Sequence, residues 1–216
     1  MGAEAALSVG RIIETPECVA EGVAWLARSN PRFAHAFEMT GQPPLRRRAD
    51  GFAALLDAIV SQQVSVASAD AIWARLENAG LTEPAPILAA TDEALRAVGL
   101  SRQKARYARA LAEADIAYPD LKVLPDEEVV ATLIEVPGIG RWTAEIYAMF
   151  SLGRADVFAP GDLALQEAAR ALFDLPARPT EKELRLLSED WSPWRSVAAR
   201  LLWSYYHVAK EREGIR

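Results

Sequence analysis

The stretch that decides the fold is Val136-Pro137-Gly138-Ile139-Gly140-Arg141-Trp142-Thr143-Ala144. A helical pattern of apolar residues precedes this stretch, and a second apolar helical pattern follows it. Pro137 ends the first helix, and the turn after it needs backbone angles that only glycine adopts at low cost. The sequence therefore predicts two helices joined by a tight hairpin with glycine at positions 138 and 140.

A hairpin of this composition can hold phosphate. Without Cβ atoms at Gly138 and Gly140, a sugar–phosphate backbone can approach the chain closely. The N–H groups from Gly138 to Thr143 face outward at a helix N-terminus, and Arg141 and the Thr143 hydroxyl can contact the same phosphates. None of these groups reads a base, so we expect sequence-independent binding. Pro-Gly-x-Gly alone also fits an ordinary corner between two helices.

A second short stretch places a carboxylate at the start of another helix. It runs Val157-Phe158-Ala159-Pro160-Gly161-Asp162. Asp162 is a candidate catalytic acid, but aspartate is also a favoured residue for capping a helix N-terminus. The two roles are compatible, because a helix N-terminus favours the ionised carboxylate.

The totals fit a helical globular protein. The 216 residues are 51% hydrophobic and 25% charged, which is ordinary for a globular chain that forms one large domain or two small lobes. Patterns with helical period recur along the chain and alternating patterns are nearly absent, so we expect an all-α fold of many short helices. No apolar run approaches the roughly 18 residues of a membrane span. No signal-peptide pattern starts the chain, and we expect a cytoplasmic protein without membrane contact.

Cysteine and histidine usage excludes several classes of site. Cys18 is alone, so we expect no disulfide framework, no cysteine-bound zinc and no iron–sulfur cluster. His35 and His207 lie far apart in the sequence and give no metal-ligand spacing. The sequence therefore predicts no metal held by side chains.

The charge distribution is uneven. A net charge of −6 argues mildly against a nucleic-acid partner. Basic residues nevertheless cluster at residues 46–48 and again at Arg102, Lys104, Arg106 and Arg109. Arg102, Arg106 and Arg109 share a helix face, for which a solvated surface is the usual explanation.

The hairpin and its continuation into the aspartate loop closely resemble the helix-hairpin-helix–Gly/Pro–Asp (HhH-GPD) superfamily of DNA glycosylases, and within it the 3-methyladenine DNA glycosylase II type. Three further strings carry the resemblance: Leu45-Arg46-Arg47-Arg48 with Ile59-Val60-Ser61-Gln62-Gln63-Val64-Ser65, Gly99-Leu100-Ser101-Arg102-Gln103-Lys104-Ala105, and Trp191-Ser192-Pro193-Trp194-Arg195-Ser196. The resemblance implies an all-α, two-lobed fold with the active site in the cleft between the lobes. We expect a central domain over residues 52–154 that carries the hairpin. Residues 1–51 with 155–216 are expected to form a second domain that carries the aspartate loop and the C-terminal helices.

The resemblance implies base excision repair. Such an enzyme flips a damaged nucleotide out of the duplex and hydrolyses its N-glycosidic bond, which leaves an abasic site. Asp162 occupies the catalytic aspartate position and is expected to stabilise the positive charge that develops on the sugar. Trp142 stands where bifunctional relatives have the lysine that forms a Schiff base, so strand cleavage is not expected.

The expected base pocket contains Trp142, Trp203, Ile146 and Gln62. Alkylated purines of the 3-methyladenine and 7-methylguanine type are cationic, and aromatic faces attract cations. The two tryptophans match pocket tryptophans of the family, although core packing is the commoner role of a helical tryptophan. The chain departs from the family pattern at Ile146, where a well-studied member has tyrosine.

The remaining expected DNA contacts come from the hairpin and from the junction at residues 61–65. Gln63 matches the wedge residue that fills the space left by the flipped base, where the best-known member has leucine. Alternatively, Gln62 and Gln63 are ordinary surface residues without a binding role. The predicted DNA-binding residues are Gln63, Ser65, Pro137, Gly138, Ile139, Gly140, Arg141 and Thr143.

The resemblance also bounds cofactors and partners. We expect no organic cofactor, although hairpin carbonyls in this family can hold a monovalent cation such as Na⁺ or K⁺. The expected partner is double-stranded DNA with a damaged base, bound by a monomer. Two alternatives stay open: a non-enzymatic helix-hairpin-helix DNA-binding module, which does not require Asp162, and a glycosylase for oxidised, deaminated or mismatched bases.

Overall fold

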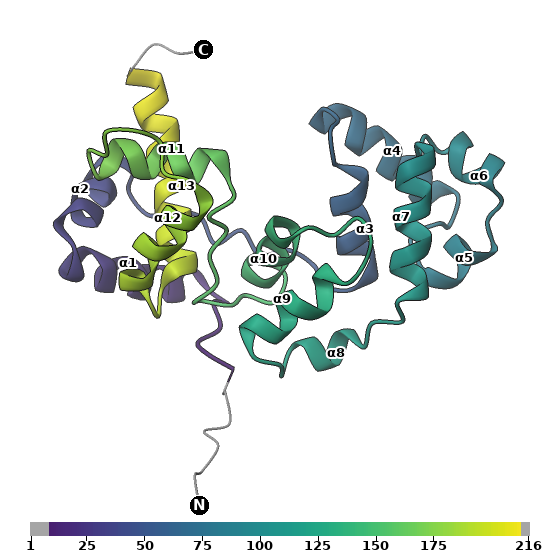
Figure 1. Ribbon diagram of the computed structural model, residues 1–216, viewed down its shortest axis with the longest axis horizontal. Coiled ribbons are helices and arrows are strands. Elements are labelled where there is room, and N and C mark those ends of the chain that lie inside the picture. Colours follow the sequence, from purple (N-terminus) through teal and green to yellow (C-terminus); the bar gives the residue numbers. More distant parts are fainter. Residues whose placement is uncertain (1–8, 213–216) are drawn as a thin grey trace, which may run out of the picture. The chain divides into compact units, whose positions relative to one another are not determined.

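The computed structural model describes residues 9–212, and these form helices joined by short loops (Figure 1). The only extended pairing within that range is an isolated bridge between Ile12 and Arg154. The all-α prediction is confirmed. Across the same range, no helix has the length and apolar character that crossing a bilayer requires. The chain divides into two compact units, a central unit over 48–147 and a flanking unit of 9–47 with 148–212.

The central unit contains the hairpin. Its helices are α3 (Phe52–Val60), α4 (Val66–Asn78), α5 (Pro84–Ala89), α6 (Asp92–Ala97), α7 (Arg102–Glu113), α8 (Tyr118–Leu121), α9 (Asp126–Ile134) and the first part of α10 (Arg141–Phe150). Helix α7 packs against α3, α5 and α6. The apolar stripe of α3 is fully buried at Leu55, Leu56 and Ile59, as its helical spacing predicts.

The flanking unit contains the aspartate loop. Its helices are α1 (Pro16–Ser29), α2 (Pro31–Thr40), α11 (Leu163–Leu172), α12 (Glu181–Leu187), the 3₁₀ helix η1 (Ser188–Trp191) and α13 (Arg195–Arg212). Helix α13 packs against α1, α2 and α11. Trp191 forms an aromatic cluster with Phe33, Phe158 and Phe173, with ring centroids 5.2–5.6 Å apart. This cluster fixes the elements that lead into and out of the aspartate loop.

The unit boundaries at 47/48 and 147/148 differ from the expected boundaries at 51/52 and 154/155. Tertiary contacts explain both shifts. The Gly51 amide donates to the Tyr147 hydroxyl at 2.9 Å, which ties the segment before α3 to the central unit. Arg200 donates to the Met149 carbonyl at 3.3 Å, which ties the end of α10 to the flanking unit.

Candidate active site

The two hairpin glycines have different reasons to be glycine. Gly138 has a φ of +98°, and a Cβ there would lie 2.4 Å from Cγ of Tyr107 on α7. Internal packing therefore requires glycine at 138 whether or not DNA is present. A Cβ at Gly140 would meet nothing within 4 Å, so the fold does not explain this second glycine. The open space above Gly140 is where a ligand backbone can approach.

The first turn of α10 presents backbone amides to that space. The helical hydrogen bonds of α10 start with the Ala144 amide, which donates to the Gly140 carbonyl at 3.0 Å. The amides before Ala144 are therefore the N-terminal groups of a helix, to which an anion binds. Arg141 is exposed beside them, and its guanidinium lies 3.7 Å from Glu145 and 4.0 Å from Glu127. These two carboxylates orient the guanidinium and offset part of its charge.

Two of the predicted DNA-binding residues of the hairpin have buried side chains. Ile139 is 4% exposed and Thr143 is 8% exposed, so both side chains are buried within the unit. The phosphate contact of the Thr143 hydroxyl stays a prediction. Their backbone groups can contact DNA without exposure of the side chains, whereas the side chain of Pro137 is exposed.

The turn between α3 and α4 is tied to the hairpin. The Gln62 side-chain amide donates to the Gly138 carbonyl at 2.9 Å, across 76 positions of sequence. This hydrogen bond gives Gln62 a structural role in fixing the hairpin, and its predicted place in a base pocket stays a prediction. Gln63 next to it is exposed and has a φ of +56°, a left-handed conformation that is uncommon for glutamine. A strained backbone conformation of this kind persists where surrounding contacts impose it, and it is found most often at functional sites. It therefore favours the predicted wedge role of Gln63 over that of an ordinary surface residue.

Ser65 has a local structural role. Its hydroxyl caps α4 by accepting from the Ser68 amide at 3.3 Å. Helix α4 therefore begins at the end of the turn that carries Gln63. A DNA contact by Ser65 stays a prediction.

Trp142 and Ile146 lie one turn apart on α10 and so share a helix face. Trp142 is 47% exposed, which excludes the core-packing explanation for this tryptophan. Ile146 is half-buried beside it. An exposed indole next to an aliphatic side chain forms a flat apolar surface that can stack with a base.

In the flanking unit, Asp162 caps α11 through one carboxylate oxygen. Its Oδ1 accepts hydrogen bonds from the Ala164 amide at 2.9 Å and the Leu165 amide at 3.1 Å. The indole N–H of Trp203, on α13, donates to the same oxygen at 3.3 Å. Three donors from two elements therefore fix the orientation of the carboxylate.

Gln166 supports the aspartate loop. Its buried side-chain amide donates to the Pro160 carbonyl at 2.8 Å, which holds the loop against the first turn of α11. Gln166 was not among the residues predicted from the sequence. The available signal was an amide four positions after Asp162, on the first turns of the same helix.

Trp203 packs near Phe150, and Phe150 in turn contacts the Arg200 guanidinium. Its ring lies 5.7 Å from the Phe150 ring, and the Arg200 guanidinium lies 4.6 Å from the same Phe150 ring. Arg200 is 2% exposed and donates to the carbonyls of Leu45, Ser196 and Met149. Burial lowers the pKa of Arg200 to about 10, so the guanidinium stays charged at neutral pH. No sequence pattern predicted Phe150 or Arg200 as supports of the aspartate.

Comparison with known proteins identifies the family. Residues 56–193 match the family described as "HhH-GPD superfamily base excision DNA repair protein". The chain belongs to the HhH-GPD superfamily. A DNA-3-methyladenine glycosylase 1 of Schizosaccharomyces pombe is 33% identical over 171 residues, which span 75% of this chain and 75% of that protein.

Solved HhH-GPD structures agree. The crystal structure of a DNA-3-methyladenine glycosidase from Bacillus halodurans is similar with a TM-score of 0.81 at 30% identity, over 93% of this chain and 94% of that one. A 3-methyladenine DNA glycosylase from Schizosaccharomyces pombe, solved in complex with abasic DNA, gives a TM-score of 0.74 at 29% identity, over 85% and 95% of the two chains. The resemblance stated from the sequence is confirmed.

The structure gathers the predicted HhH-GPD site residues into two groups, one in each unit. The central unit holds the hairpin, the Gln63 turn and the Trp142–Ile146 surface. The flanking unit holds Asp162 in contact with Trp203. Each group is fixed internally by hydrogen bonds or by a shared helix.

The backbone carbonyl oxygens of the hairpin are the candidate ligands of the expected monovalent cation. No group of three or more His, Cys, Asp or Glu residues within the described range could hold a metal ion. Among the hairpin carbonyls, Val136 accepts from the Ile139 amide at 3.0 Å and Gly138 accepts from Gln62. A carbonyl has two lone pairs, so both oxygens can also face a cation, and uncharged oxygens fit an alkali ion. The cation stays a prediction.

Proposed function

We propose that the chain is a monofunctional DNA glycosylase that removes alkylated purines from double-stranded DNA, acting as a monomer. The observation that carries the proposal is the Asp162 carboxylate, held by three donors at the end of the Pro-Gly-Asp loop. A DNA-binding module needs no such carboxylate. The names of the relatives support alkylated bases as the substrate class.

In the proposed mechanism, the site residues of the central unit bind the phosphate and the flipped base, and Asp162 of the flanking unit acts on the sugar. The backbone amides at the start of α10 hold phosphate, and Gln63 occupies the opened base step. The flipped base, which alkylation makes cationic, stacks on the Trp142 surface. The C1′–N bond then breaks and its electron pair leaves with the base, which departs as a neutral molecule. Asp162 stabilises the oxocarbenium-like sugar, and a water oxygen bonds to C1′ and releases a proton.

Base release from a panel of duplexes tests the substrate class. We expect excision of 3-methyladenine and 7-methylguanine and little release of 8-oxoguanine, uracil or mismatched bases, measured by chromatography of the freed base. Preferential release of an oxidised, deaminated or mismatched base would establish the alternative glycosylase instead. Binding without any release would favour the DNA-binding module.

Strand cleavage is not expected, because Trp142 offers no amine to form a Schiff base. Incubation with damaged duplex and borohydride should give no covalent protein–DNA adduct, and the abasic strand should break only after added alkali. A bifunctional glycosylase assayed in parallel provides the positive control. A trapped adduct would overturn the monofunctional proposal.

Replacing Trp203 with phenylalanine separates two roles of this residue. Trp203→Phe keeps an aromatic ring and removes the N–H that donates to Asp162. A hydrogen bond to a charged group contributes roughly 1.5–3 kcal/mol, so we expect single-turnover excision to fall by about 10-fold or more. Affinity for abasic duplex should not change. A wild-type rate would show that the carboxylate does not depend on the indole.

A further inference from the structure

The basic run on α7 has no role in the mechanism above, yet contacts fix it beside both DNA-binding elements of the central unit. The Lys104 ammonium donates to the Val60 carbonyl at 2.6 Å, directly before the Gln63 turn. The Tyr107 ring lies against Gly138 of the hairpin. The N-terminal half of α7 is therefore anchored to the Gln63 turn at one point and to the hairpin at another.

Two arginines on this half of α7 are available to a ligand. Arg102 and Arg106 are exposed, and neither forms an ion pair with any residue in the described part of the chain. The Arg106 guanidinium lies 5.7 Å from the Tyr107 ring, which places its charge next to the residue that contacts the hairpin. Arg109 differs, because it pairs with Asp92 and donates to the Ala90 carbonyl at 2.7 Å. The charge of Arg109 is therefore balanced by contacts within the central unit.

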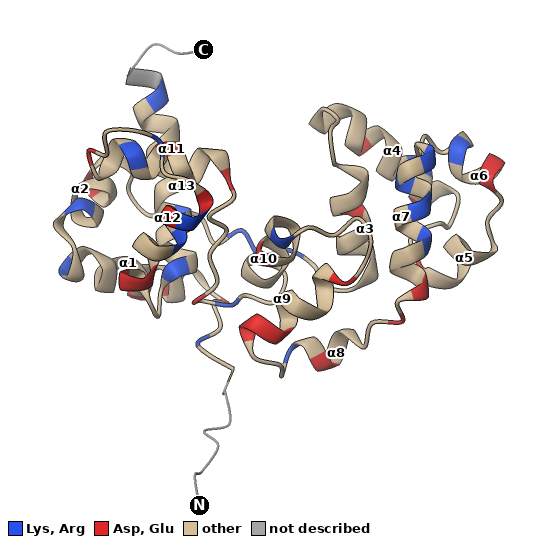
Figure 2. Cartoon of the chain, viewed as in Figure 1, with Lys and Arg blue, Asp and Glu red and all other residues tan. Residues whose placement is uncertain are grey.

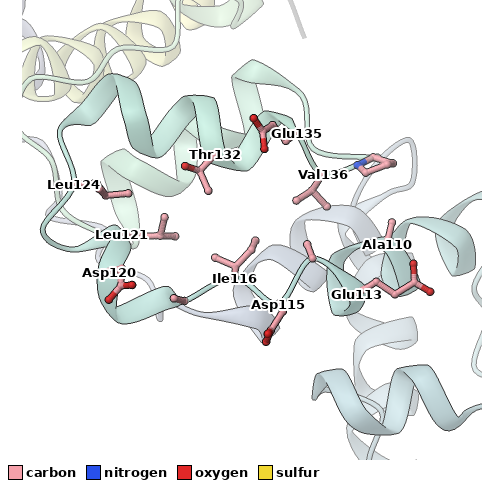
Figure 3. Close-up of a pocket in the computed structure, with 13 residues that line it drawn as sticks. Ala110, Glu113, Asp115, Ile116, Asp120, Leu121, Leu124, Thr132, Glu135 and Val136 are labelled. Carbon is pink, nitrogen blue, oxygen red and sulfur yellow. The ribbon is translucent and has the colours of Figure 1, made fainter.

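The charge changes sign along α7. Figure 2 shows the basic residues gathered along the helix and acidic residues at its C-terminal end. Beyond that end lies a hollow of about 630 Å³ with an apolar floor that includes Ile116 and Leu121 (Figure 3). Its charged lining residues are all acidic: Glu113, Asp115, Asp120 and Glu135. Phosphates are repelled from this hollow and attracted to the opposite half of α7.

The charges of the rest of the chain favour phosphate contacts outside the hairpin. The chain carries a net charge of −6, and the hairpin's own Arg141 is flanked by Glu127 and Glu145. Binding to DNA draws most of its affinity from cations that replace counterions on phosphates. The hairpin alone supplies few unpaired cations for that purpose.

We propose that the DNA interface extends from the hairpin and the Gln63 turn onto the N-terminal half of α7, where Arg102 and Arg106 contact phosphates of the DNA backbone. Contacts of this kind are independent of sequence and of damage, because the phosphates of the backbone carry no sequence information. This inference rests on the proposed DNA-binding function. It adds a second phosphate-binding surface to the one at the hairpin.

The test is the salt dependence of DNA binding by the full chain. For Arg102→Gln with Arg106→Gln, we expect the slope of log K against log salt to become shallower by about 2, since each lost phosphate contact changes it by about 0.9. Affinity should fall equally for undamaged and abasic duplexes, measured by fluorescence anisotropy.

Control variants make the outcome decisive. Arg28→Gln removes one exposed charge from α1 in the flanking unit and should leave the slope unchanged. A wild-type slope in the double variant, with its melting temperature preserved, would overturn the inference. Equal slope changes in Arg28→Gln and in each α7 single variant would do the same, because they would reduce the effect to net charge. Asp162→Asn measured in parallel isolates the catalytic proposal, since that variant should bind with the wild-type slope.

Discussion

Asp162→Asn is expected to lower single-turnover excision of an alkylated purine by about 1,000-fold, because fixed electrostatic groups of this kind are worth about 10²–10³ or more in rate. Asparagine removes the negative charge beside the sugar but keeps an oxygen that can accept from the Ala164 and Leu165 amides. Asparagine is also a good N-cap, so α11 should stay formed. The measurement is rapid mixing with excess enzyme, followed by chromatography of the freed base.

The control for this variant is Asp190→Asn, which removes an exposed carboxylate from η1 in the same unit. It should leave the rate and the melting temperature unchanged. Asp162→Asn should also bind abasic duplex with wild-type affinity, because the expected loss lies in the chemical step. An Asp162→Asn rate within about 3-fold of wild type would leave the catalytic role without support, since such a difference is worth less than 1 kcal/mol.

The second large effect concerns the two hairpin glycines, which differ in the space available for a Cβ atom. Gly138→Ala places a Cβ 2.4 Å from the Tyr107 ring at a φ of +98°, so backbone strain and overpacking act together. We expect the free energy of unfolding to fall by about 3 kcal/mol, with loss of DNA binding as the hairpin shifts. Urea denaturation followed by tryptophan fluorescence measures the stability.

Gly140→Ala is the matched substitution two positions away. Its Cβ meets nothing within 4 Å, so stability should change by no more than about 0.5 kcal/mol. DNA affinity should nevertheless fall by about 10-fold, because the methyl group occupies the space of the approaching backbone, and one lost phosphate contact is worth about that much. Wild-type affinity in this variant would mean that DNA does not approach the chain at Gly140.

The sequence was sufficient for features that depend on local chemistry. Pro137 and the two glycines predict a hairpin because they restrict or free the backbone at their own positions. Asp162 predicts a helix N-terminus for the same kind of reason, and the structure places it there. Local signals also predict the all-α class, because helical periodicity is read within each segment.

Contacts between distant segments could not be read from the sequence. The glycine backbone angles at Gly138 were predicted, whereas its close packing against Tyr107, which lies 31 positions earlier, was not. The hydrogen bond from the Gln62 amide to the Gly138 carbonyl, across 76 positions of sequence, was likewise not predicted. The Arg200–Phe150–Trp203 support depends on the meeting of α10 and α13, for which no periodicity gives a signal.

The hydrogen bond from Gln62 to the Gly138 carbonyl joins the turn that carries Gln63 to the hairpin. In the proposed interface, Gln63 opens a base step and the hairpin binds a phosphate. We expect this hydrogen bond to keep the two elements at one fixed separation, so that the opened step lies a constant number of nucleotides from the bound phosphate.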